Sequence, residues 1–160
     1  MKALVVYDSV FGNTEKIAQA IGQALGSPEE IETHRVSEVT PEQLTKTTLL
    51  VVGSPTRQFR PTPATSNLLK SIPANGLQGV RVAAFDTRFP ESTINQNRIL
   101  AFFVKIFGYA AKPLADRLVK EGGVLALPPE GFYVADTEGP LLEGELERAA
   151  AWAGQLVTAQ

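Results

Sequence analysis

The sequence of 160 residues contains no cysteine and a single histidine. Without cysteine, the chain can form no disulfide, thiolate nucleophile, iron–sulfur cluster or zinc–thiolate site. One histidine also leaves little for a histidine-based metal site or catalytic triad. If the protein carries out redox chemistry, its electrons must therefore reside on a bound organic cofactor. We predict neither a metal site nor a catalytic acid or base.

Runs of like charge and long apolar runs are also missing. The formal net charge is -2 and no cluster of lysine or arginine occurs, so we expect no nucleic-acid-binding surface. The most apolar stretch, residues 99–111, contains Lys105 and Gly108 and is shorter than the roughly 20 residues that span a bilayer. The N-terminal segment shows no signal-peptide pattern. We therefore expect a cytoplasmic protein with no membrane span.

Short β-rich runs alternate with longer helical patterns along the chain. Strands are predicted at residues 3–7, 31–36, 49–52, 80–85 and 123–127, with residues 132–134 as a candidate extension of the last. Helices are predicted at residues 12–25, 64–71, 94–107 and 113–120, and again after residue 142. This alternation predicts an α/β doubly wound fold, with helices on both faces of a parallel sheet. No long linker divides the chain, so residues 1–160 are expected to form a single domain.

A polar loop joins the first predicted strand to the first predicted helix. Ser9, Asn13 and Thr14 supply hydrogen-bonding side chains, and Gly12 permits a close ligand approach or a positive φ angle. Because the N–H groups of the new helix point to the same place, the loop is a candidate phosphate-binding site. Simple capping of the helix is the alternative interpretation. NAD-binding and NTPase sites are not favoured, because the second glycine and the Walker lysine are missing.

This loop and three later segments resemble the flavodoxin family. The segments are Ser9-x-x-Gly12-Asn13-Thr14, Gly53-Ser54-Pro55-Thr56, Phe85-Asp86-Thr87-Arg88, and residues 130–134 followed by 138–141. They are similar to the family's phosphate loop, its second and third flavin loops, and the junction before its last helix. The resemblance implies a three-layer flavodoxin-like fold with a five-stranded parallel sheet in the order 2-1-3-4-5.

The resemblance also implies FMN as the cofactor and a low-potential electron carrier that serves a reductase and an acceptor protein. The first loop would hold the phosphate, and the isoalloxazine ring would lie between the second and third loops. Phe59, and less strongly Phe89, are candidates for stacking on the ring, although both are equally explained as loop anchors. The implied cofactor-binding residues are Ser9, Val10, Phe11, Gly12, Asn13, Thr14, Ser54, Pro55, Thr56, Arg57, Gln58, Phe59, Asp86, Thr87, Arg88 and Phe89.

The chain departs from the family pattern in two loops. Phe11 replaces a threonine of the phosphate loop, which removes a hydrogen bond worth roughly 1.5–3 kcal/mol to a charged group. The second loop, residues 56–61, lacks the glycine that many flavodoxins carry there. A non-glycine residue forced to positive φ at this point would cost on the order of 1–2 kcal/mol.

Three arginines distinguish the predicted flavin loops from those of typical flavodoxins, which are acidic. Arg57, Arg60 and Arg88 would favour the anionic reduced flavin if they border the ring. Alternatively, they point into water or pair with Glu91 and Asp86.

Two other functions stay open. The segment 54–59 partly resembles the Pro-Thr-Arg-Phe loop of flavodoxin-like NAD(P)H:quinone oxidoreductases, which makes an NAD(P)H-dependent quinone or flavin reductase one alternative. The other is a flavin-free module that binds partner proteins. Residues 99–107 are apolar nearly all round, so we expect a deeply buried helix. Exposure of Phe103 or Phe107 as a partner surface is the alternative, and we expect a monomer or weak dimer.

Overall fold

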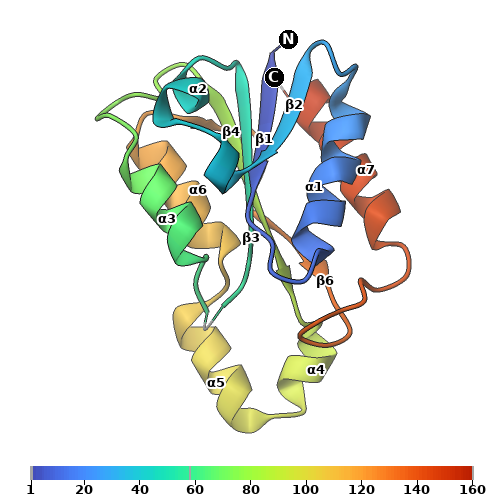
Figure 1. Ribbon diagram of the computed structural model, residues 1–160. Coiled ribbons are helices and arrows are strands. Elements are labelled where there is room, and N and C mark those ends of the chain that lie inside the picture. The colour runs from blue at the N-terminus through green and yellow to red at the C-terminus, as the bar shows by residue number, and fades with distance from the viewer. Residues whose placement is uncertain (1, 58, 160) are drawn as a thin grey trace.

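The computed structural model describes residues 2–57 and 59–159, with the side chains of residues 106 and 107 excepted. Its strands form one parallel sheet in the order β2-β1-β3-β4-β5, and β6 also pairs with β4 (Figure 1). The predicted order 2-1-3-4-5 is confirmed, with a sixth strand added. The strands are β1 (Ala3–Tyr7), β2 (Ile31–Arg35), β3 (Leu49–Pro55), β4 (Arg81–Arg88), β5 (Val124–Leu125) and β6 (Glu130–Tyr133).

The last predicted strand is split into two short pieces along the same edge of β4. Arg81 and Val82 pair with β5, and the segment Phe85–Arg88 pairs with β6. Pro128 and Pro129 lie between the two pieces. Because proline has no N–H to donate, the ladder of hydrogen bonds is interrupted there.

Helices cover both faces of the sheet, which gives three layers (Figure 1). On one face lie α1 (Asn13–Leu25) and α7 (Glu145–Thr158), and on the other lie α3 (Pro63–Lys70) and α6 (Ala111–Lys120). Two short elements, the 3-10 helix η1 (Val36–Glu38) and α2 (Pro41–Thr45), join β2 to β3.

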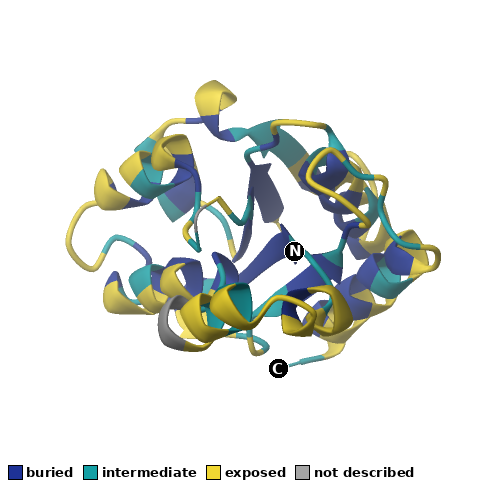
Figure 2. Ribbon diagram, turned by 90° about the horizontal axis from the view of Figure 1, so that it is seen from below, coloured by how far each residue is buried: buried dark blue, intermediate teal, exposed yellow. Residues whose placement is uncertain are grey.

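The core is divided by the sheet into two apolar clusters (Figure 2). In β1, Ala3 and Val5 pack toward α1 and α7, whereas Leu4 and Val6 pack toward α3 and α6. This alternation follows from the two-residue period of a strand, and it explains why β1 is apolar at every position.

The segment after β4 differs most from its prediction. Instead of one helix over residues 94–107, it forms α4 (Glu91–Asn95) and α5 (Arg98–Phe107). The helix restarts at Asn97, whose side chain accepts hydrogen bonds from the N–H groups of Ile99 and Leu100 at 3.1 Å. The expectation of deep burial is wrong, because Ile99 is 70% exposed and Phe102 is 59% exposed. Both helices project beyond the carboxyl ends of the strands (Figure 1).

Candidate functional site

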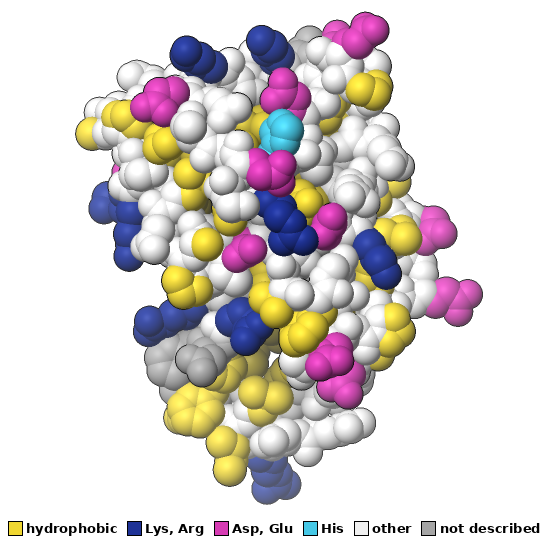
Figure 3. Space-filling model, viewed as in Figure 1, with side chains coloured by type: hydrophobic (Ala, Val, Ile, Leu, Met, Phe, Trp, Pro, Cys, Tyr) yellow, Lys and Arg dark blue, Asp and Glu magenta, His cyan; other side chains and the backbone are white. Residues whose placement is uncertain are grey.

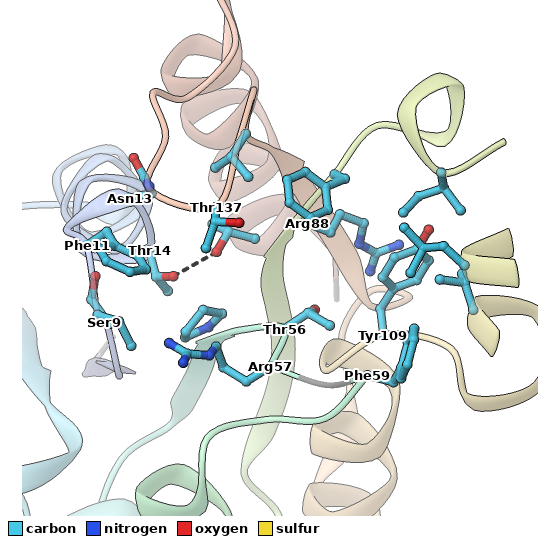
Figure 4. A pocket seen from close by; sticks show the side chains of 18 residues that line it. Ser9, Phe11, Asn13, Thr14, Thr56, Arg57, Phe59, Arg88, Tyr109 and Thr137 are labelled. Carbon is cyan, nitrogen blue, oxygen red and sulfur yellow. Dashed lines mark hydrogen bonds between the residues drawn. The ribbon is translucent and has the colours of Figure 1, made fainter. Parts of the chain in front are cut away.

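A cavity of about 310 Å³ lies where β1, β3 and β4 end (Figure 4). In a parallel α/β sheet, the loops at the carboxyl ends of the strands converge on one edge, and ligands bind where the strand order reverses. Here the loops after β1, β3 and β4 meet, and α4 and α5 close the cavity from outside. The predicted site residues that line it are Ser9, Val10, Phe11, Asn13, Thr14, Pro55, Thr56, Arg57, Phe59, Thr87, Arg88 and Phe89.

Three predicted site residues do not line the cavity: Gly12 lies in the loop after β1, Ser54 near the end of β3 and Asp86 near the end of β4. Gly12 donates its N–H to Ser9 Oγ at 3.0 Å, and Ser54 Oγ accepts a hydrogen bond from Thr62 N–H at 3.0 Å. Asp86 is fully buried behind the wall. These residues shape the loops that carry the lining side chains. Gln58 lies outside the described residues.

The loop after β1 forms the polar end of the cavity. Gly12 has a φ of 92°, in the left-handed region that favours glycine, and α1 begins at the next residue. Within the described chain, no side chain caps the first turn of α1, so its free N–H groups remain available to an anion. The Oγ1 atoms of Thr14 and Thr87 are 2.9 Å apart, which ties the first loop to the third (Figure 4).

The loop after β3 is a tight turn. The backbones of Arg57 and Arg60 exchange two hydrogen bonds, at 2.8 and 3.0 Å. Thr62, at the end of the loop, donates from Oγ1 to Asp8 Oδ2 at 2.5 Å. Phe59 has a φ of 68°, which for a non-glycine residue costs on the order of 1–2 kcal/mol. The glycine-free loop therefore holds a strained phenylalanine in the cavity wall.

The end of β4 carries a buried ion pair. Arg88 donates from Nε and Nη2 to the two carboxylate oxygens of Asp86, at 2.6 and 2.7 Å. The N–H of Ala111 adds a bond of 2.9 Å to the same carboxylate. Burial raises the pKa of Asp86, and the hydrogen bonds and charge of Arg88, with the bond from Ala111, oppose that rise only in part. The predicted alternative for Arg88, pairing with Asp86, is confirmed.

The two arginines that line the cavity, Arg57 and Arg88, differ in how far their charge is neutralised. The guanidinium of Arg88 is neutralised and stacks 3.8 Å above the ring of Tyr109, whose pKa is raised mainly by burial. Arg57 lines the cavity, is exposed and forms no ion pair with a described residue. Arg57 is therefore the cation with the stronger electrostatic effect on a ligand in the cavity.

The outer wall was missed by the sequence-based prediction. It is largely apolar and comes from α4, α5, the start of α6 and the segment after β6. The sequence could have indicated this wall, because the segment after β4 starts at the carboxyl edge of the sheet, where ligands bind. The lining residues that were not predicted are Ile94, Leu100, Val104, Tyr109, Val134 and Thr137.

Chemically, the cavity joins a hydroxyl-rich anion site to an apolar chamber. The part of the chain that the structure describes contains no group of three histidine, aspartate or glutamate side chains able to hold a metal ion. Such an arrangement suits a flat, largely apolar ring with an anionic tail.

Comparison with known families identifies this architecture. The flavodoxin family model matches residues 5–87, which contain the first two loops and the start of the third. The chain belongs to the flavodoxin family. None of the curated proteins matches its sequence. No helix within residues 2–57 and 59–159 has the length and apolar character needed to cross a membrane.

Solved structures agree with the family assignment. This flavodoxin-family chain is similar to an archaeal flavodoxin, with a TM-score of 0.74 and 21% identity over 99% of this chain and 97% of the other. Flavodoxin 1 of Bacillus cereus gives a TM-score of 0.76 at 17% identity, over 100% and 99% of the two chains. Rubredoxin oxygen:oxidoreductase of Desulfovibrio gigas matches over 99% of this chain but 35% of its own, with a TM-score of 0.71 and 20% identity. At these identities, the likeness establishes the fold.

Proposed function

We propose that this flavodoxin-family protein binds FMN in the cavity and carries electrons at low potential between a reductase and an acceptor protein. The observation that carries the proposal is a single cavity with two ends. The start of α1, which no described side chain caps, forms one end, and apolar side chains line the other. Flavodoxins generally bind FMN, and family membership supports the same cofactor here.

The residues present fit FMN at both ends of the cavity. The phosphate would lie at the start of α1, beside Ser9, Asn13 and Thr14. Since residues 9–14 contain no lysine or arginine, neutral donors and the helix dipole would hold it. The isoalloxazine would lie between the second and third loops, and bound FMN would supply one- and two-electron transfer.

Apolar side chains of the outer wall would control access to the ring. Leu100 and Val104 line the cavity from α5, and Ile94 lines it from α4. By excluding water from one side of the ring, they strengthen the electrostatic effect of nearby charges. Arg57, which lines the cavity and forms no ion pair with a described residue, would then favour a negatively charged reduced ring.

An FMN titration of the purified protein, followed by flavin absorbance and fluorescence quenching, tests this proposal. We expect saturable one-to-one quenching at micromolar FMN or below. Riboflavin, which lacks the phosphate, should bind at least about tenfold more weakly, because it forgoes the charge-assisted bonds at α1.

Two other outcomes would redirect the proposal. No quenching at micromolar FMN would reject it and favour the flavin-free partner-binding module. If the FMN-loaded protein alone oxidises NAD(P)H with a quinone in steady state, it is a reductase, because a pure carrier turns over only with its partners.

A further inference from the structure

A second hollow adjoins the cavity. It is a groove of about 580 Å³ between α3 and α6. Phe59 lines both the cavity and the groove, so the two are neighbours. Among the residues that line the groove, three carry positive charge and none carries negative charge: Arg60, Lys70 and Arg117.

These positive charges are poorly compensated within the described chain. Arg60 and Lys70 are exposed and pair with no described carboxylate. Arg117 pairs with Glu121 at 3.1 Å, yet its Nε is buried without a hydrogen-bond partner in the described part of the protein. The groove is therefore locally basic in a protein whose net charge is -2.

An exposed aromatic cluster lies next to the groove. The rings of Phe59 and Phe103 are 6.0 Å apart, and those of Phe103 and Phe102 are 5.9 Å apart. Ile99, Phe102 and Phe103 form an exposed apolar surface on α5. Arg98 lies in the first turn of that helix and Lys105 in its last turn. Figure 3 shows positive side chains on the left, from the level of α3 down to the apolar surface over α5.

Together these residues form what we call the docking face. Its centre is Phe59, Ile99, Phe102 and Phe103, and its rim is Arg57, Arg60, Lys70, Arg98, Lys105 and Arg117. An apolar aromatic centre with a charged rim is the usual anatomy of a protein interface. The face adjoins the mouth of the cavity, where a flavin would exchange electrons.

We propose that an acidic redox protein docks on this face, a proposal that rests on the proposed electron-carrier function. Charge complementarity argues for the occupant, because an acidic surface would neutralise Arg60 and Lys70, which pair with no described carboxylate. The shape argues for a protein rather than an anionic membrane, since the α3–α6 groove is a hollow of about 580 Å³ that a flat lipid surface would not fill. In the complex, one electron leaves the partner, which is oxidised, and enters the bound flavin, which is reduced.

A reduced acidic plant-type [2Fe–2S] ferredoxin is a suitable electron-donating probe. Its oxidation by the FMN-loaded protein is followed in an anaerobic stopped-flow instrument at several salt concentrations. The test variant is Arg60→Glu with Lys70→Glu. The matched control is Lys46→Glu with Lys120→Glu, which changes the net charge equally at exposed positions outside the docking face.

Electrostatic attraction at the docking face predicts a selective effect. The second-order rate constant should fall with added salt, and at low salt it should fall about tenfold in the test variant. The control should stay within about twofold of the unchanged protein. Equal losses in the two variants, or a rate that rises with salt, would overturn the proposal.

A readout that needs no flavin separates this proposal from the cofactor proposal. In amide NMR spectra of the FMN-free protein, added oxidised ferredoxin should shift resonances of residues 59–70 and of α5. Shifts confined to α1 and α7 would refute the docking face. So would α5 shifts that depend on protein concentration alone, which indicate a second copy, or binding to phosphatidylglycerol vesicles without binding to ferredoxin.

Discussion

The two walls of the cavity are built in different ways. The inner wall consists of loops at the ends of β1, β3 and β4, joined to one another by hydrogen bonds such as Thr14 to Thr87 and Thr62 to Asp8. The outer wall consists of α4 and α5, where α5 packs chiefly against α4 and presents Ile99 and Phe102 to solvent. The inner wall is held in place by the sheet. The outer wall is held mainly by contacts between α4 and α5, which are neighbours in the sequence.

This difference matches the two tasks that the proposed electron-carrier function requires. Groups that hold a phosphate or orient a ring need fixed positions, and a buried, hydrogen-bonded loop provides them. A surface that meets other proteins needs exposed apolar area, and α5 provides it at Ile99, Phe102 and Phe103. The segment after β4 supplies that area while it also covers the cavity.

The largest expected contrast is between two phenylalanines, one from each region. Phe85 on β4 is fully buried and packs edge-on against Phe132 and Trp152, so Phe85→Ala should cost about 3–5 kcal/mol of unfolding free energy. Phe102→Ala on α5 should change it by less than about 0.5 kcal/mol, because that ring is 59% exposed. Urea denaturation of the FMN-free protein measures both. A large loss for Phe102→Ala would show that α5 is part of the folding core.

The sequence predicts the buried region better than the exposed one. Ala3–Tyr7 and the period of Ile17 and Ile21 determine which faces are covered, because strands and helices bury apolar residues at different periods. The apolar run at residues 99–107 does not determine its own surroundings. Its side chains can be covered by this chain or by another protein. Both kinds of burial require apolar residues, so the sequence of the segment does not distinguish them.

The next prediction concerns the polar end of the inner wall. Phe11 lines the cavity and is 47% exposed, so it can be replaced at little cost in stability. Phe11→Thr should tighten FMN binding about tenfold, because the hydroxyl of the new threonine adds a hydrogen bond to the phosphate. Fluorescence titration measures the change, and riboflavin serves as the control ligand, since its affinity should not improve. An equal gain in affinity for FMN and riboflavin would show that the new side chain does not act through the phosphate.

The site was predictable where a loop follows a strand, and less so elsewhere. Polar residues after β1 and β3 indicate a ligand at the carboxyl edge without knowledge of packing. Asp86 shows the limit, because its position in the third loop suggested contact with a cofactor. Its carboxylate instead binds Arg88 and the N–H of Ala111 behind the wall, a role that depends on the distant start of α6.

A smaller effect is expected at the carboxylate of Glu145, which fastens the start of α7 to β6. Glu145 accepts hydrogen bonds from Tyr133 N–H at 2.7 Å and from Arg148 Nε at 2.9 Å. Burial opposes ionisation of Glu145, but these bonds and the charge of Arg148 outweigh it, and the pKa is lowered. Glu145→Gln should therefore cost about 1 kcal/mol of unfolding free energy at pH 7.

The pH dependence of that cost follows from the direction of the shift. A carboxyl group whose pKa is lowered by folding stabilises the protein above its unfolded pKa, about 4.3 for glutamate. The contribution is lost as the pH falls through the folded value. The difference between the unchanged protein and Glu145→Gln should thus shrink below about pH 4 in urea denaturation series. A difference that is constant down to pH 3 would contradict the electrostatic origin.

The smallest expected effect tests whether strain at the junction of the two walls serves binding. Phe59→Gly should leave the unfolding free energy within about 0.5 kcal/mol of that of the unchanged protein, because relief of its φ of 68° is offset by the added entropy of the unfolded chain and by the lost ring contact with Phe103. Asn75→Gly is the matched control. Asn75 has a φ of 58°, but asparagine tolerates this region, so little change is expected there. If Phe59→Gly keeps its stability but binds FMN several-fold more weakly, the strained ring is retained for ligand contact. If binding is unchanged, Phe59 belongs to the docking face alone, and the second loop holds a ligand through its backbone.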